Sequence, residues 1–273
     1  MDNVRKSVIA GSWYPGDPPV LKRDIAEYFR NVPDRGLSGE VVGLIAPHAG
    51  YRYSGQVAAY AYQLVRGKNY DGVVLIGPSH RVAFPGVSVW GSGAFETPLG
   101  HVPVHEKLAQ EMTRASGILV DFPAAHAHEH SLEIQLPFLQ MALGDFSFVP
   151  LVMGDQDAAT CRKLAKVIVQ AGKNRRLLVV ASSDLSHFHE DEKARALDGA
   201  TLKHVRDNDA EGLLEDLARG QTEACGGGPM AVTMMAARGL GASHSLLLKY
   251  AHSGEATGDL QSVVGYAAAV YYQ

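Results

Sequence analysis

Three apolar segments of this chain each end in residues that can bind a metal or transfer a proton. The segment VVGLIAPH ends at His48, VVLIGPSH ends at His80, and LLVVASSDLSH contains Asp184 and His187. Histidine and aspartate serve as general acids and bases, and both bind transition metals. One histidine at a strand end is often only a satisfied polar group, but three such ends together predict a shared polar site.

Each segment has the pattern of a strand buried on both faces. Val41 to Ile45, Gly72 to Ile76 and Arg176 to Ser182 are almost continuously apolar, as in parallel sheets covered by helices. Proline after the first two runs favours their end, because proline cannot donate to the ladder of a sheet. Open α/β sheets bind ligands at the carboxyl ends of their strands, so we expect the polar side chains to meet there.

Asp184 and His187 are three residues apart and can share one face of a helical turn. The carboxylate could orient the His187 ring, or it could itself bind a metal. Ser182 and Ser183 beside this pair suggest a serine hydrolase. The GxSxG turn that exposes such a serine is absent, which disfavours that interpretation.

The rest of the chain alternates between helical and strand patterns. Helices are predicted over 20–29, 55–65, 105–115, 131–143, 158–170, 191–205, 210–218 and 229–239. Pro137 predicts a kink or a late start in the helix over 131–143. Strands are predicted over 87–90, 118–120, 146–153, 245–251 and 262–271. No repeat, linker or change of composition divides the sequence. We therefore predict a single α/β domain over residues 1–273, with a mostly parallel central sheet covered by helices on both faces.

Composition narrows the class of protein. The 273 residues are 46% hydrophobic and 20% charged, and 25 basic against 29 acidic residues give a net charge of −4. Nucleic acid and anionic membranes are therefore not expected partners. The sequence shows no signal peptide and no 18-residue apolar run, and its two cysteines do not form a disulfide framework. A cytoplasmic protein is expected.

Cys225 stands in a glycine-rich turn, ACGGGP, before a predicted helix. Amide groups at a helix start favour a thiolate, which is a better metal ligand or nucleophile than a thiol. The glycines would also allow phosphate binding, but no Lys-Ser/Thr follows, which excludes a P-loop. Cys161, inside an amphipathic helix, is expected to be a buried small side chain.

Histidines alternate at 126, 128 and 130. His126 and His128 are expected mostly at the surface. His130 and Glu133, on either side of a helix start, are candidates for substrate contacts at the margin of the site. The sequence alone does not indicate whether Glu129 belongs to the site.

Several segments, in order along nearly the whole chain, resemble the Memo family, the middle partner of the bacterial and archaeal AmmeMemoRadiSam set. They are AGSWYPGD, APHAGYRYSG, LIGPSH, EHSLEIQLPFL, SSDLSHF, ACGGGP and KYAHSGEATGD with SVVGYAA. The Memo fold is similar to that of the class III extradiol (LigB-type) dioxygenases, which use non-haem Fe(II). The resemblance implies a LigB/Memo-like fold and a functional association with the other AmmeMemoRadiSam proteins.

The resemblance also implies a set of site residues. They are His48, His80 and Cys225 as metal ligands, Asp184 and His187 as catalytic residues beside them, and Trp13 and Tyr53 as pocket walls. The dioxygenases use glutamate as the third ligand, so Cys225 departs from the 2-His-1-carboxylate pattern. Fe(II) is the expected cofactor, although a His₂Cys set also accepts copper or zinc.

Three functions follow as hypotheses. The first is a metal-dependent, dioxygenase-like redox enzyme acting on a small molecule or peptide, with His187 as general acid or base. The second is a non-catalytic module that binds a peptide or protein through Trp13, Tyr51 and Tyr53, since eukaryotic Memo proteins are associated with signalling. The third is a zinc hydrolase that uses metal-bound water.

Overall fold

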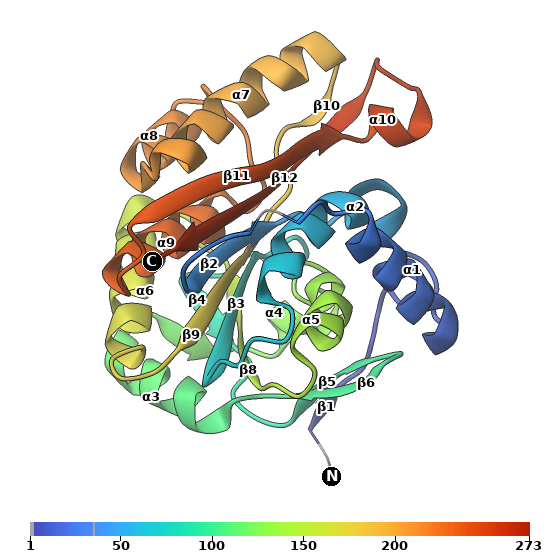
Figure 1. Ribbon diagram of the computed structural model, residues 1–273. Helices are drawn as coiled ribbons and strands as arrows, with labels where there is room; N and C mark the ends of the chain where they lie inside the picture. Colours follow the sequence, from blue (N-terminus) through green and yellow to red (C-terminus); the bar gives the residue numbers. More distant parts are fainter. Residues whose placement is uncertain (1–2, 35) are drawn as a thin grey trace.

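The computed structural model describes residues 3–34 and 36–273 and contains two sheets. The larger sheet has the strand order β10-β12-β2-β9-β3-β8-β4-β7. Strand β11 pairs with β12 along the edge opposite to β2. Its centre consists of four parallel strands, which are β2 (Val41–Ala46), β9 (Leu177–Ser182), β3 (Gly72–Pro78) and β8 (Phe148–Met153). The predicted α/β fold is confirmed (Figure 1), and these four parallel strands are buried along their whole length.

The flanking strands make the sheet mixed. Antiparallel strands adjoin both sides of the parallel centre: β12 (Val263–Tyr272) beside β2, and β4 (Val87–Val89) beside β8. Further out lie β11 (His244–His252), β10 (His187–His189) and β7 (Leu119–Asp121). A small second sheet joins β1 (Val4–Arg5), β5 (Ala94–Thr97) and β6 (Gly100–Pro103), which are too short for a periodic pattern to predict.

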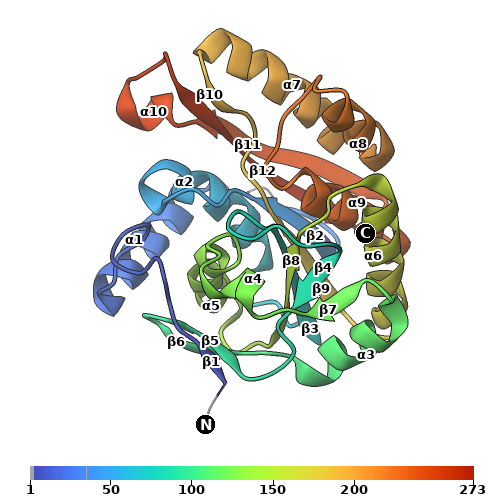
Figure 2. The same ribbon diagram turned by 180° about the vertical axis from the view of Figure 1, so that it is seen from behind.

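Helices cover both faces of the large sheet, as the two opposite views show (Figures 1 and 2). One face carries α1 (Pro18–Arg30), α2 (Tyr51–Tyr62) with a 3₁₀ turn at Gln63–Val65, and α5 (Leu136–Leu143). The other carries α3 (Glu106–Ser116), α6 (Ala158–Ala171), α7 (Asp191–Asp207), α8 (Ala210–Ala218) and α9 (Gly227–Gly239). Two single turns, α4 (Ala124–Ala127) and α10 (Gly254–Thr257), complete the helices.

Alternate residues of the central strands pack into two separate hydrophobic clusters. In β3, Val73 and Leu75 belong to the cluster under α2 and α5, whereas Val74 and Ile76 belong to the cluster under α6 and α9. All four are fully buried, and burying one such side chain contributes about 1.5–3 kcal/mol. Both faces therefore hold the strands in place, and the strand ends can support a rigid site.

One helix boundary differs from the prediction, and another is confirmed. Helix α2 begins at Tyr51, four residues before the predicted start at Gly55. A Cβ atom at Gly55 would lie 2.8 Å from the Tyr28 ring, so close helix packing accounts for this glycine. Pro137 stands in the first turn of α5, after a 3₁₀ turn at Glu133–Gln135, which confirms the late start. Among the described residues, no helix has the length and apolar character needed to cross a bilayer.

Candidate metal centre

The carboxyl ends of β2, β9 and β3 lie side by side, and each is followed by a residue with metal-binding or proton-transfer chemistry. Ala46 pairs with Ser182, and Ile76 pairs with Ala181, so the three strands end at the same level. His48, Asp184 and His80 each follow two residues after their strand. The structure thus brings these side chains to one edge, as the strand pattern predicted.

Cys225 reaches the same edge from the turn before α9. A Cβ atom at Gly226 would lie 2.4 Å from the Ser182 carbonyl oxygen, so only glycine allows the turn to approach β9 this closely. Gln156 holds the turn from the other side, because its amide donates to the Cys225 carbonyl and accepts from the Gly228 N–H group. As a result, Cys225 Sγ lies 3.1 Å from His48 Nε2.

One ligand atom each from His48, His80 and Cys225 lies within 4.8 Å of the other two. Bonds of about 2.1 Å to nitrogen and 2.3 Å to sulfur place the ligands of a tetrahedral ion roughly 3.5 Å apart. The observed 3.1 Å between His48 Nε2 and Cys225 Sγ is close to this separation. Two imidazoles and one thiol in this arrangement fit iron, copper or zinc.

The predicted activation of Cys225 by the helix start is not what the structure indicates. Burial, and then the charge of Asp184, raise the pKa of the Cys225 thiol well above its usual value. The protein alone therefore holds a neutral thiol, and a metal ion must displace its proton to bind the sulfur.

The ring of His48 is fixed in one tautomer by Ser182. The Ser182 hydroxyl donates to the Ser131 carbonyl at 2.5 Å and accepts from the Gln135 amide at 2.8 Å. Its hydrogen is therefore used, and it accepts from His48 Nδ1 at 3.0 Å. Nε2 of His48 keeps its lone pair toward Cys225, and burial lowers the pKa of His48 to about 3, which keeps the ring neutral.

Asp184 lies beside His48, and among the described residues it forms no hydrogen bond with His187. Its Oδ1 accepts the His48 backbone N–H at 2.7 Å, and its Oδ2 lies 3.9 Å from His48 Nε2. Burial raises the pKa of the Asp184 carboxyl to about 6. The structure thus does not support the expectation that Asp184 orients His187, and it places the Asp184 carboxylate next to Nε2 of His48, a candidate ligand atom.

A cavity of about 430 Å³ is lined by His48 and His80, two of the three candidate ligands. Its walls combine aromatic, apolar and polar residues, which are Ser12, Trp13, His48, Ala49, Gly50, Tyr53, His80, His130, Asp184, His187, Val264 and Tyr266. This volume is typical of small-molecule sites. The predicted pocket residues Trp13, Tyr53 and His130 all line it.

His187 and His130 occupy the cavity wall in different ways. His187 belongs to β10 and stands opposite Val264 in the pairing with β12. His130 is buried, stacks on His80 with ring centres 4.5 Å apart, and contacts Trp13. Burial lowers the pKa of His130 to about 3, and its Nδ1 has no hydrogen-bond partner among the described residues.

Glu133, predicted to contact a substrate at the margin of the site, does not line this cavity. Its fully buried carboxylate forms an ion pair with Arg5 and accepts from further donors, which are the Ser7 and Tyr14 hydroxyls and the Val8 and Ile9 N–H groups. These bonds anchor the segment that carries Trp13, whose carbonyl accepts from the Tyr51 N–H group. Glu133 therefore supports the cavity wall from behind.

His126, His128 and His252 are among the histidines outside the cavity lining. His126 was expected at the surface but is buried against Ser88, because the turn at α4 folds inward. His128 is exposed, as predicted. His252 is buried and pairs with Asp191 at 2.7 Å. The residue that the sequence left unplaced, Glu129, contacts His80 directly.

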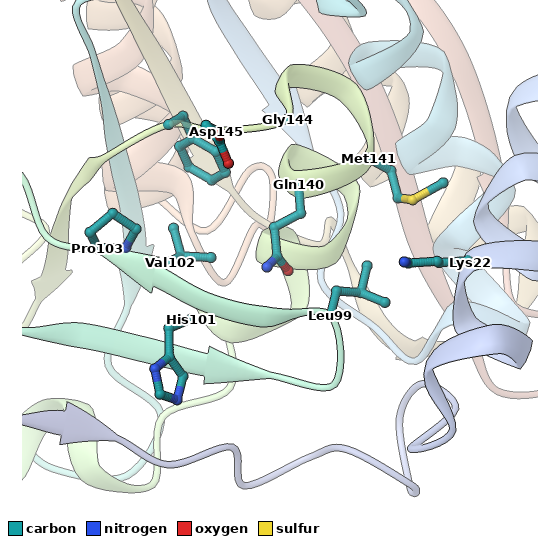
Figure 3. A pocket seen from close by; sticks show the side chains of 10 residues that line it. Lys22, Leu99, His101, Val102, Pro103, Gln140, Met141, Gly144 and Asp145 are labelled. Carbon is teal, nitrogen blue, oxygen red and sulfur yellow. The ribbon is translucent and has the colours of Figure 1, made fainter.

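A second cavity of about 500 Å³ lies between the β5–β6 hairpin and the end of α5 (Figure 3). Its one histidine, His101, points away from Gln140 in this view. The Gln140 amide is already bonded to Thr97 and to the Gly100 carbonyl. Among the described residues, no candidate metal-binding group lines this cavity, so the cavity at the strand ends is the better candidate site.

Comparison with known proteins identifies the family. The Memo-like protein family pattern matches residues 5–270. A MEMO1 family protein of Methanopyrus kandleri is 38% identical over 278 residues, with 98% of each chain covered. This chain belongs to the Memo family. Another MEMO1 family protein, from Ignicoccus hospitalis, is 40% identical over 277 residues, with 97% of each chain covered.

The Memo fold of this chain also has a structural counterpart. An uncharacterized protein of Escherichia coli K12 superimposes with a TM-score of 0.53 and 14% sequence identity, covering 84% of this chain and 99% of that one. At this identity the likeness concerns the fold alone. The family and the fold are established together, and the reaction has to be inferred from the site.

Proposed function

We propose that this Memo family protein is a metal-dependent redox enzyme whose ion is held by His48, His80 and Cys225. The main support for this proposal is that two imidazoles and one thiol lie close together at the carboxyl ends of the central strands. Bound Fe(II), the favoured ion, would supply a redox-active centre with open positions for small ligands. Copper and zinc accept the same donors and belong in the same test.

His187 is proposed as the general acid or base. Its ring lines the cavity and makes no side-chain hydrogen bond among the described residues, so both ring nitrogens are available to a bound molecule. An imidazole is suited to proton transfer near neutral pH. Asp184 contributes by holding the His48 backbone and by placing a carboxyl oxygen beside the ligand nitrogen.

The cavity walls indicate the kind of substrate. Trp13, Tyr53 and Tyr266 offer aromatic surface, and the volume of about 430 Å³ suits a small molecule or one peptide side chain. The exposed ring of Tyr53 also favours the alternative of a binding module that holds a peptide without turnover. A functional association with the other AmmeMemoRadiSam proteins remains a prediction from the family.

The test is anaerobic loading with Fe(II), Cu(I) or Zn(II), followed by a screen of small aromatic molecules and peptides for turnover and oxygen uptake. We expect one ion per chain and redox turnover in the parent. The His187→Ala variant should keep the ion and lose turnover, and His101→Ala should retain both. Peptide binding without turnover would support the binding module, and hydrolysis only with zinc would support a zinc hydrolase.

A further inference from the structure

The carboxylate of Glu129 is buried beside His80, with 2% of the residue exposed. Its Oε1 accepts from the Nδ1 of His80 and from the backbone N–H groups of His130 and Ser131, each at 2.9 Å. Its Oε2 accepts from the His80 backbone N–H at 2.6 Å. One side chain thus binds both the ring and the backbone of a proposed metal ligand.

Four N–H groups face the two carboxylate oxygens of Glu129, and three of them belong to the backbone and can only donate. This is the environment of an ionised carboxylate. A carboxylate only accepts hydrogen bonds. Nδ1 of His80 therefore carries the hydrogen, and the lone pair of its ring is on Nε2.

We propose that Glu129 is a positioning residue that fixes the ring and tautomer of His80 so that Nε2 is free to bind the metal ion. This inference rests on the proposed function, because it concerns the same site. A carboxylate behind a ligating histidine orients the ring and makes it a more basic ligand. It also ties His80, after β3, to the segment that carries His130.

The two proposed histidine ligands are held differently. Ser182, a neutral hydroxyl, accepts from the Nδ1 of His48, whereas a charged carboxylate accepts from the Nδ1 of His80. Hydrogen bonds to an ionised acceptor are roughly twice as strong as bonds between neutral groups. Loss of Glu129 should therefore weaken metal binding more than loss of the Ser182 hydroxyl.

The same residues could instead be a second cation site, because His80, Glu129 and His130 also offer ligand atoms within 4.8 Å of one another. Both oxygens of Glu129, however, already face N–H groups, three of them from the backbone. Backbone N–H groups cannot give way to a cation without moving the chain. The geometry therefore favours the positioning role over a second ion.

The first experiment compares anaerobic Co(II) titrations of the parent, Glu129→Gln and the exposed control Glu106→Gln. The Glu129 variant should bind one ion about 10–100-fold more weakly than the parent. Glu106→Gln should match the parent. Equal affinity of Glu129→Gln and parent would overturn the proposal, and so would two ions per parent chain with the second lost in Glu129→Gln.

A second measurement needs neither the ion nor a Glu129 variant, so it remains decisive if Glu129→Gln fails to fold. Ring ¹⁵N chemical shifts of the metal-free protein report the tautomer of each histidine, and His80→Ala assigns the His80 signals. We expect the Nδ1–H tautomer at His80, and the Nε2–H tautomer would overturn the inference. A parent that binds no ion would instead refute the proposed function, leaving this tautomer test intact.

Discussion

Nε2 of His48 lies 3.1 Å from Sγ of Cys225, although 177 positions separate the two residues in the sequence. The contact joins the end of β2 to the turn before α9. It depends on Gly226, where any side chain would collide with the end of β9. The sulfur and the nitrogen therefore meet because of how the strands and the turn pack, and this contact defines the proposed metal centre.

The hydroxyl that holds the His48 ring should affect metal affinity. Ser182→Ala removes the acceptor of His48 Nδ1–H, so the ring can change tautomer or rotate. We expect a loss of roughly tenfold in affinity, measured by anaerobic titration. Ser88→Ala is the matched control, because Ser88 is also a buried serine that contacts a histidine, His126, away from the cavity. An equal loss in both variants would contradict this role for Ser182.

The ion pair behind the cavity wall should matter for stability. Glu133→Ala leaves Arg5 buried without its charged partner, which typically costs about 3–5 kcal/mol of unfolding free energy. Denaturant unfolding measures this loss. Replacing both residues by methionine should restore part of the stability, because no buried charge then remains unpaired. A Glu133→Ala variant within about 0.5 kcal/mol of the parent would be inconsistent with this role.

His126 should make stability depend on pH. Burial, and then the charge of Arg5, lower its pKa from 6.5 in the unfolded chain to about 3 in the folded protein. The unfolded chain therefore binds more protons between these values, and the stability present above pH 6.5 is lost as the pH falls toward 3.

The His126→Gln variant removes this titration. Near pH 5 the slope of unfolding free energy against pH should fall by about 1.4 kcal/mol per pH unit, the value for one proton. His128→Gln changes an exposed histidine two residues away and should leave the slope as in the parent. An unchanged slope in His126→Gln would show that the ring is not kept neutral by the fold.

The aromatic wall should affect binding of a substrate but not of the metal. Trp13 lines the cavity and contacts His130, yet it offers no ligand atom to the ion. Trp13→Ala should therefore lower the affinity for any substrate or peptide found in the screen by tenfold or more, while the ion affinity stays within twofold. Trp90→Ala, outside this cavity, controls for the loss of a tryptophan. A parallel loss of ion and substrate binding would contradict this division.

The sequence predicted the parts of the site that follow from strand patterns. His48, His80 and Asp184 each come directly after a buried parallel strand, and the ends of such strands must share an edge. The position of Cys225 in the proposed site was predicted only from the resemblance to the Memo family, because a glycine-rich turn does not indicate which strand it approaches. Glu129 was assigned no place and Glu133 was expected at the margin of the site, because local sequence does not reveal whether a carboxylate faces a cavity or an internal cation. An acidic residue among three histidines was the available signal for Glu129.

The most direct test of the metal centre is the absorption spectrum of the Co(II)-loaded protein, in which a thiolate ligand gives a sulfur-to-metal charge-transfer band. Cys161 is the internal control, since it is the other cysteine and lies buried in α6. We predict one Co(II) per chain with this band in the parent and in Cys161→Ser, and no band in Cys225→Ser. A band that persists in Cys225→Ser, or a parent that binds Co(II) without one, would contradict the proposed ligand set.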